Sequence, residues 1–227
     1  LILSNPHNPA GIVWPRETLE RLASFCHSRG IIVISDEIHC DMALYGNRHI
    51  PFASVSPEAA ACSITFGAPS KTFNIAGIVS SYSVVPNDSL RHRFHEWMEA
   101  NEMNAAPLFS PIATIAAFRK GEEWRKQMLE YVEGNINFLT DYCREKMPEI
   151  KPLRPQASFL VWLDCRSLGL DHDQLIDLFI NKAGLALNDG EMFNPGGQGF
   201  MRLNVGTPRK ILKSALDRLH KAISENL

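Results

Sequence analysis

Polar side chains that could take part in catalysis or ligand binding follow three short apolar runs of the sequence. Asn8, Asp36 and Lys71 each come shortly after such a run. The runs are Leu1–Ser4, Ile31–Ser35 and Ser63–Phe66. If these runs are neighbouring parallel strands, their carboxyl ends lie at one edge of the sheet, where open α/β sheets bind ligands. The spacing therefore predicts that an amide, a carboxylate and an amine converge on one crevice.

These groups together define a particular kind of chemistry. A lysine amine such as Lys71 can condense with an aldehyde to form a Schiff base. A carboxylate such as Asp36 favours the protonated form of a pyridine nitrogen, and a protonated pyridine ring withdraws electrons from an adjacent carbanion. The amide of Asn8 and the imidazole of His39 could bind a phenolic oxygen on the same ring. We interpret the set as the protein groups needed to hold pyridoxal 5′-phosphate (PLP).

The elements around these residues favour an α/β fold. The turn-forming residues 5–11 follow the first run, and residues Pro15–Arg29 carry apolar side chains at helical spacing, ending at Gly30. The run Ile31–Ser35 has no polar alternation, as in a strand buried on both faces. The order strand, loop, helix, strand predicts a mainly parallel sheet with crossover helices.

The remainder of the sequence predicts a second, smaller region. Residues 113–146 read as helical, with Gly121 and Gly134 as points where the helix could divide. We expect part of a large α/β domain over residues 1–110, a helical connector over 111–147 and a small α+β domain over 148–227. The other expected strands are Ile78–Val85, Ser158–Asp164, Leu185–Leu187 and Phe200–Val205, and the other expected helices are Arg91–Asn101, His172–Ala183 and Pro208–Ser224.

Several motifs carry a resemblance to a known family. The segments Asn5–Gly11, Asp36–His39 and Ser70–Asn74 resemble the signature segments of fold-type I, class I/II PLP-dependent aminotransferases. Their form is most similar to the cystathionine β-lyase-like (MalY/PatB-type) branch of C–S lyases. The segments Pro155–Trp162 and Gly199–Asn204 match as well. The resemblance covers essentially the whole chain, and it implies the PLP-dependent transferase fold of type I.

The resemblance assigns cofactor roles residue by residue. Lys71 would form the Schiff base with PLP and move the α-proton of the substrate. Asp36 would pair with the pyridine nitrogen, and Asn8 would bind the ring's 3′-oxygen. His39 stands where many aminotransferases have a tyrosine and would help that oxygen or the Schiff base. Ser70 would contact the phosphate.

Arg202 and Val79 carry the remaining implications of the resemblance. Arg202 would bind the α-carboxylate of the substrate, since its planar guanidinium suits bidentate recognition. Common aminotransferases have a phosphate-binding arginine eight residues after the lysine, where this sequence has Val79; this favours the lyase branch. The family's glycine-rich phosphate loop and ring-stacking aromatic residue precede the first strand seen here. We therefore expect a C-terminal portion of a longer protein, with an incomplete site that is inactive alone.

The resemblance implies a reaction class with two alternatives. The first reading is a C–S β-lyase that converts cystathionine or cysteine conjugates into pyruvate, ammonia and a thiol. A class I/II aminotransferase shares the steps up to proton removal and remains an alternative. A regulatory interaction protein on a PLP-enzyme scaffold is a further alternative. The family also implies a homodimer in the full-length protein.

Composition excludes several other classes of function. The 227 residues contain 23 basic and 25 acidic side chains, a formal net charge of −2, which gives no reason to expect nucleic acid or an anionic membrane as partner. No run of apolar residues is long enough to cross a membrane. The five cysteines form no C-x-x-C pair and predict reduced thiols in a cytoplasmic protein. We expect no metal site and a small amino-acid substrate.

Overall fold

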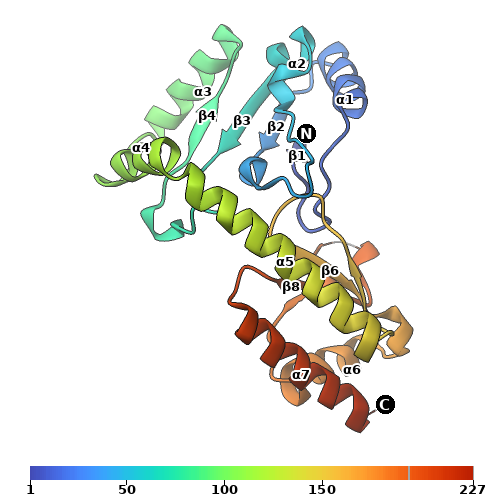
Figure 1. Cartoon of the computed structure of the whole chain (residues 1–227). Helices are drawn as coiled ribbons and strands as arrows, with labels where there is room; N and C mark the ends of the chain where they lie inside the picture. The colour runs from blue at the N-terminus through green and yellow to red at the C-terminus, as the bar shows by residue number, and fades with distance from the viewer. Residues whose placement is uncertain (194, 227) are drawn as a thin grey trace. The chain divides into compact units, whose positions relative to one another are not determined.

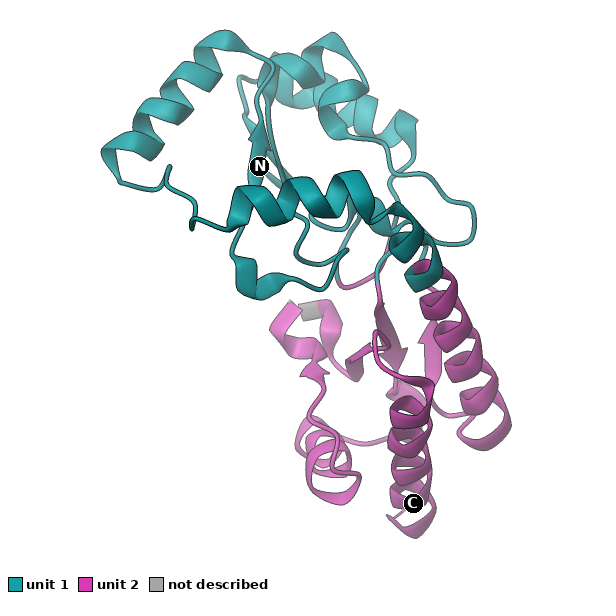
Figure 2. Cartoon of the chain, turned by 60° about the vertical axis from the view of Figure 1, so that its left-hand side comes forward, with its two compact units in different colours: residues 1–8, 12–128, 156–158 teal, residues 9–11, 129–155, 159–227 magenta. Residues whose placement is uncertain are grey.

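The computed structural model describes residues 1–193 and 195–226. The chain forms two compact units, coloured teal and magenta in Figure 2. The first unit comprises Leu1–Asn8, Ile12–Met128 and Gln156–Ser158, and the second comprises Pro9–Gly11, Leu129–Pro155 and Phe159–Leu227. Each unit has its own sheet, and each is described by itself below.

The first unit contains a four-stranded sheet in the order β1-β2-β3-β4 (Figure 1). Its strands are β1 (Ile2–Ser4), β2 (Val33–Asp36), β3 (Ser63–Gly67) and β4 (Tyr82–Val84). The first three strands are parallel, and β4 runs antiparallel to β3. The predicted α/β architecture with a mainly parallel sheet is therefore confirmed.

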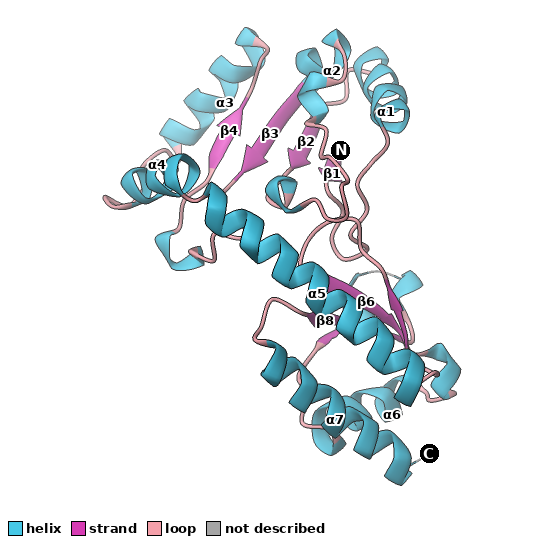
Figure 3. Ribbon diagram, in the orientation of Figure 1, coloured by secondary structure: helices cyan, strands magenta, loops and turns pink. Residues whose placement is uncertain are grey.

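Helices and short helical turns complete the first unit (Figure 3). They are α1 (Arg16–Ser28), α2 (Pro57–Cys62), α3 (Asp88–Ala100), α4 (Ser110–Lys120) and the start of α5 (Glu122–Lys146), with 3₁₀ turns at Cys40–Met42, Phe52–Ser54 and Ala76–Ile78. The side chains of Ser56 and Asn87 cap α2 and α3 by accepting hydrogen bonds from the backbone N–H groups of Ala59 and Leu90, the third residue of each helix.

The core of the first unit lies between the sheet and its first two helices. Leu3 and Val33 of the sheet pack with Leu19 and Ala23 of α1 and with Phe52, and all five side chains are buried. The predicted apolar stripe of the first helix is thus the surface that covers the sheet. Burial of such side chains contributes most of the free energy that keeps an amphipathic helix in place.

Several predicted elements differ in their bounds, and the strand from Ile78 and the long helix after Ala113 differ most. The strand expected from Ile78 begins only at Tyr82, because Ala76–Ile78 forms a 3₁₀ turn and Val79 has a left-handed backbone with φ of 50°. The long helical stretch divides at Gly121, whose N–H bonds to the carbonyl oxygen of Ala117 and ends α4. Gly134, the other expected division point, lies inside α5.

The second unit contains an antiparallel sheet in the order β5-β6-β8-β7. Its strands are β5 (Lys151–Leu153), β6 (Leu160–Asp164), β7 (Asn188–Asp189) and β8 (Phe200–Asn204), and its helices are the later part of α5, α6 (His172–Asp177), a π-helical turn at Leu178–Lys182 and α7 (Arg209–Asn226). Short 3₁₀ turns occur at Arg166–Leu168, Gly190–Phe193 and Pro195–Gly197. The α+β character predicted beyond residue 148 is what the structure shows.

The strand expected at Leu185–Leu187 is wrong. The N–H of Leu185 bonds to the carbonyl oxygen of Phe179, and the N–H of Leu187 bonds to that of Leu185, so these groups are used locally. The pairing with β8 is made instead by Asn188 and Asp189. Within the described residues, no helix is both long and apolar enough to span a membrane.

Candidate active site

The carboxyl ends of the three parallel strands lie side by side. Ser4 is in register with Asp36, and Asp36 with Phe66. The N–H of Asn5 donates to the carbonyl oxygen of Asp36 at 2.9 Å, and the N–H of Glu37 donates to that of Phe66 at 2.8 Å. The loops that follow β1, β2 and β3 therefore leave the sheet at the same edge.

Two of the predicted cofactor residues lie at the ends of β1 and β2. Asp36 is the last residue of β2; it is exposed, and its Oδ1 accepts a hydrogen bond from the N–H of Ile38 at 3.1 Å. Asn8 is half-buried in the turn after β1, and its N–H donates to Oγ of Ser4 at 3.2 Å. The structure thus holds one carboxylate at the end of β2 and one amide in the loop after β1, at the same edge of the sheet.

Lys71 lies in a tight turn that follows β3. The N–H of Phe73 donates to the carbonyl oxygen of Pro69, and that of Ile75 donates to the carbonyl oxygen of Ser70. Thr72 is fully buried in this turn, whereas its neighbour Lys71 is exposed. The turn therefore directs the amine of Lys71 outward.

The ring of Phe73 anchors this turn to α4 and α5. It lies edge-on to Phe118, with ring centroids 5.6 Å apart, and tilted against Trp124 at 5.9 Å. Its Cε1 atom occupies space beside Gly121, where an added Cβ would come within 2.5 Å. The absence of a side chain at Gly121 makes room for the ring two residues after Lys71.

His39 and Cys40 follow β2. His39 is 3% exposed, and its carbonyl oxygen accepts a hydrogen bond from the N–H of Met42 at 3.0 Å. Burial, reinforced by the carboxylates of Asp41 and Glu37, raises the pKa of Cys40 to about 12. Since the thiolate is the reactive form, Cys40 is a packed thiol and not a nucleophile.

The loop after β2 is fixed from two directions. Nη1 of Arg125, on α5, donates to the carbonyl oxygen of Asp41 at 3.0 Å. The N–H of Ser158 donates to the carbonyl oxygen of Met42, and the carbonyl oxygen of Gln156 accepts from the N–H of Leu44. The matched segment near residue 156 therefore contributes to the first unit by bracing the loop that carries His39.

Glu37 forms a buried network that sequence analysis missed. Its carboxylate accepts hydrogen bonds from Oγ of Ser35 at 2.9 Å and from the N–H of Phe52 at 2.8 Å, and it pairs with Nε2 of His49 at 2.7 Å. Glu37 is only 3% exposed. The one sequence signal was the alternation of Ser35, Asp36 and Glu37, which places Glu37 on the face opposite Asp36.

Arg202 lies in the second unit, on β8. Its Nη2 donates to Oδ1 of Asn188 at 2.7 Å, and its guanidinium carbon lies 4.6 Å from the centre of the Phe193 ring. Burial lowers the pKa of Arg202 below its usual range. The guanidinium is thus oriented by a hydrogen bond and a cation–π contact, which suits recognition of a planar anion such as a carboxylate.

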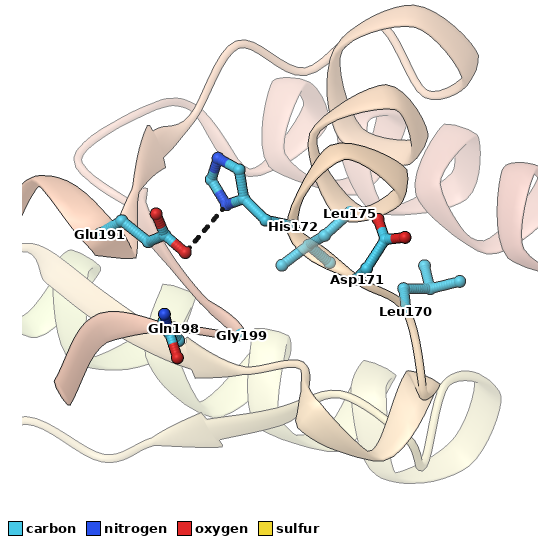
Figure 4. Close-up of a pocket in the computed structure, with 7 residues that line it drawn as sticks. All are labelled: Leu170, Asp171, His172, Leu175, Glu191, Gln198 and Gly199. Atoms are coloured by element: carbon cyan, nitrogen blue, oxygen red, sulfur yellow. Dashed lines mark ion pairs between the residues drawn. The ribbon is translucent and has the colours of Figure 1, made fainter. Parts of the chain in front are cut away.

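A cavity of about 270 Å³ opens in the second unit (Figure 4). Nδ1 of His172 lies 3.3 Å from Oε1 of Glu191, and its Nε2 lies 3.6 Å from Oδ2 of Asp189. No residue that lines this cavity belongs to the predicted site: the lining consists of Leu170, Asp171, His172, Leu175, Glu191, Gln198 and Gly199. Among the residues that the structure describes, no group of side chains has the arrangement of a metal site.

Comparison with known proteins places this geometry in a family. The chain is 40% identical over 223 residues to cystathionine β-lyase PatB of Bacillus subtilis, matching 98% of the chain and 58% of that protein. It is 25% identical over 226 residues to an aspartate aminotransferase of Geobacillus stearothermophilus, matching 97% of the chain and 56% of that protein. The chain therefore spans somewhat more than half the length of these relatives.

A solved structure shows the same fold. Cystalysin of Treponema denticola, whose crystal structure contains a PLP cofactor, superimposes with a TM-score of 0.96 at 32% identity, over 99% of this chain and 57% of cystalysin. The expected type I fold of PLP-dependent enzymes is thus confirmed. The family model for aminotransferase class I and II matches residues 1–219. Because that match includes both units, the chain belongs to the aminotransferase class I and II family.

Proposed function

We propose that the protein carrying this chain is a PLP-dependent C–S β-lyase. The observation that supports this most strongly is the common sheet edge from which the loops bearing Asn8, Asp36 and Lys71 emerge. The greater identity to a cystathionine β-lyase, 40% against 25% for the aspartate aminotransferase, favours the lyase. The proposed substrates are amino acids that carry a thiol leaving group on Cβ, such as cystathionine or cysteine conjugates.

The donor set at the sheet edge fits PLP. An exposed acid suits the pyridine nitrogen, an amide suits the 3′-oxygen, a hydroxyl suits the phosphate, and an exposed amine suits the aldehyde. We assign these roles to Asp36, Asn8, Ser70 and Lys71 in that order, with His39 beside the 3′-oxygen. When bound, PLP supplies an electron-withdrawing ring that stabilises negative charge at Cα of the substrate.

The chain's own residues then do three things. Nζ of Lys71 accepts the proton from Cα of the substrate, acting as a general base. Asp36 keeps a positive charge favourable at the pyridine nitrogen, since an opposite charge nearby stabilises the protonated form. Arg202, already oriented by Asn188 and Phe193, binds the α-carboxylate. Loss of the β-thiolate and hydrolysis yield pyruvate and ammonia.

Aminotransferase activity is the second candidate. The family match itself and the similarity to an aspartate aminotransferase favour it. Proton removal from Cα by Lys71 is common to both reactions. They differ in whether a β-substituent then leaves, or Lys71 delivers the proton elsewhere and the amino group passes to a keto acid. Val79 is a point against it, because a general aminotransferase would have arginine there to hold the phosphate.

We also propose a cytoplasmic homodimer with a large and a small domain. The two compact units support the domain division, with the boundary in the helical connector 111–147. Large apolar side chains just before α4, including Leu108 at 80% and Phe109 at 70% exposure, support burial against another surface. Sedimentation of the full-length protein tests this: a dimer is expected, and a monomer at micromolar concentration would contradict it.

Product analysis tests the reaction. The full-length protein with PLP and L-cystathionine is expected to release pyruvate, measured by coupling to lactate dehydrogenase. The Lys71→Ala variant, which lacks the proposed base, is the control and is expected to release none. Amino transfer to a keto acid without pyruvate release would contradict the lyase and favour the second candidate.

A further inference from the structure

A buried carboxylate stands directly behind the proposed cofactor-binding acid. Glu37 follows Asp36 in the chain, and successive side chains of an extended segment point to opposite faces. Asp36 is exposed, whereas Glu37 is 3% exposed and turned toward the segment that carries His49 and Phe52. Two consecutive residues therefore place one carboxylate in solvent and the other in the core.

Both carboxylate oxygens of Glu37 have hydrogen-bond partners. One carboxylate oxygen accepts from Oγ of Ser35 and from the N–H of Phe52, and the other pairs with His49, whose side chain is 9% exposed. A buried carboxylate is unfavourable unless it is paired and hydrogen-bonded, and replacing such a pair with apolar side chains often costs nothing in stability. Stability alone therefore does not account for a buried carboxylate–imidazole pair at this place.

The network fixes the backbone that carries Asp36. The N–H of Glu37 bonds to the carbonyl oxygen of Phe66 on β3, and the carbonyl oxygen of Glu37 accepts from the N–H of Cys40. The next N–H along the chain, that of Ile38, holds Oδ1 of Asp36 at 3.1 Å. Any shift of Glu37 would move both the main chain of Asp36 and the donor that orients its carboxylate.

We propose that Glu37 and His49 are positioning residues that hold Asp36 in place for the pyridine nitrogen of PLP; this assignment rests on the proposed function. His49 comes 12 positions after Glu37 and acts through it. The pair anchors the end of β2 from the side of the sheet opposite Asp36. Its purpose is orientation of the acid, as in sites where a supporting residue orients a ligand.

The test uses the full-length protein with two single variants and their combination. His49→Phe and Glu37→Gln each remove one partner of the Glu37–His49 pair, and the double variant removes both. Titration with PLP, followed by absorbance, is expected to show affinity weakened about 10-fold in His49→Phe, the size typical when a supporting partner of a metal ligand is lost. Because the two residues act as one unit, the double variant is expected to lose no more than His49→Phe.

A second readout needs no cofactor. In the PLP-free protein, amide hydrogen exchange at residues 38–40 is expected to accelerate in His49→Phe while the amides of β3 keep their protection. His49→Gln, which retains an N–H donor near the position of Nε2, is expected to restore both exchange and PLP affinity. If His49→Phe does not fold, the PLP affinity and hydrogen exchange of His49→Gln are compared with those of Glu37→Gln instead.

Asn87→Ala is the matched control. Asn87 caps α3 and donates to the carbonyl oxygen of Ala61, so its loss also weakens the first unit, but it lies beyond β4 at the opposite edge of the sheet. PLP affinity in Asn87→Ala is expected to stay within about 2-fold of wild type. If PLP affinity is weakened equally in Asn87→Ala and His49→Phe, or is not weakened in His49→Phe, the positioning role of Glu37 and His49 is overturned while the proposed function stands. A wild-type protein without PLP affinity would overturn the proposed function, and this assignment with it.

Discussion

Gly121 offers the sharpest test of how the fold places Lys71. An added Cβ in Gly121→Ala would lie 2.5 Å from the carbonyl oxygen of Ala117 and 2.5 Å from Cε1 of Phe73. The first contact is with helix backbone, which cannot move without disturbing α4. The second is with the ring that anchors the turn of Lys71. Both contacts are closer than real Cβ atoms adopt, so the structure must shift.

The magnitude follows from two opposing effects. Replacing glycine by alanine usually stabilises by about 0.4–1 kcal/mol, because the unfolded chain loses freedom. Overpacking a filled site costs about 1–3 kcal/mol. The net expectation for Gly121→Ala is a loss of about 1–2 kcal/mol in the free energy of unfolding. Displacing Phe73 by about 1 Å would also lower the rate of pyruvate formation, by up to about 100-fold.

The assay compares Gly121→Ala with two other variants of the full-length protein. Gly77→Ala is the control, because a Cβ at Gly77 meets nothing within 4 Å; it is expected to be neutral or slightly stabilising. Combining Gly121→Ala with Phe73→Leu removes the ring contact and is expected to recover part of the lost stability. Urea denaturation gives the stabilities, and pyruvate release gives the rates. A Gly121→Ala protein as stable and as active as Gly77→Ala would refute the reasoning.

Three further predictions concern other parts of the chain. Val79→Gly is expected to raise the free energy of unfolding by about 0.5–1 kcal/mol in urea denaturation, since the left-handed φ of 50° strains a β-branched residue; a loss of stability would contradict this. Cys40 and Cys143, each with a pKa raised to about 12 chiefly by burial, are expected to resist iodoacetamide at pH 8 in the native protein, and mass spectrometry showing alkylation at the rate of a free thiol would oppose that account. The pKa of Asp217 is lowered from its ordinary value of 3.8, mainly by the hydrogen bond from Lys213. Its ionised form therefore stabilises the fold fully at pH values above 3.8, and this stabilisation is lost as the pH falls through the lowered pKa. Asp217→Asn is therefore expected to be less stable than wild type at pH 7 and equal to it at low pH, with a pH-independent difference as the contrary result.

Local patterns were sufficient to predict most of the fold. The apolar spacing of Leu19, Ala23 and Cys26 predicted α1, and these are its buried side chains. The unbroken β-branched run before Asp36 predicted β2, which lies between two parallel neighbours. The expected burial of this strand on both faces is wrong, because Ile34 is 38% exposed and only alternate residues of β2 are buried. Because connections between parallel strands follow few rules, the order of these elements was enough to place the loops of the proposed cofactor site at one edge.

Features that depend on tertiary contact could not be predicted. The pair between Glu37 and His49 joins residues 12 apart with no local signal, since its partners meet only after β2 and the segment before α2 have packed. The left-handed backbone at Val79 contradicts the preference of valine and depends on its surroundings. The helix divides at Gly121 and not at Gly134, and the contact of Gly121 with the distant ring of Phe73 is one that the local sequence pattern does not show.

We propose Lys71 as the amine that binds PLP, opposite the acid at position 36. The full-length protein should be incubated with PLP, reduced with borohydride and digested, so that mass spectrometry locates the phosphopyridoxyl group. We expect a visible absorbance band before reduction and a single modified peptide that carries the group on Lys71. A band with the group fixed on another lysine, or no band at all, would contradict it.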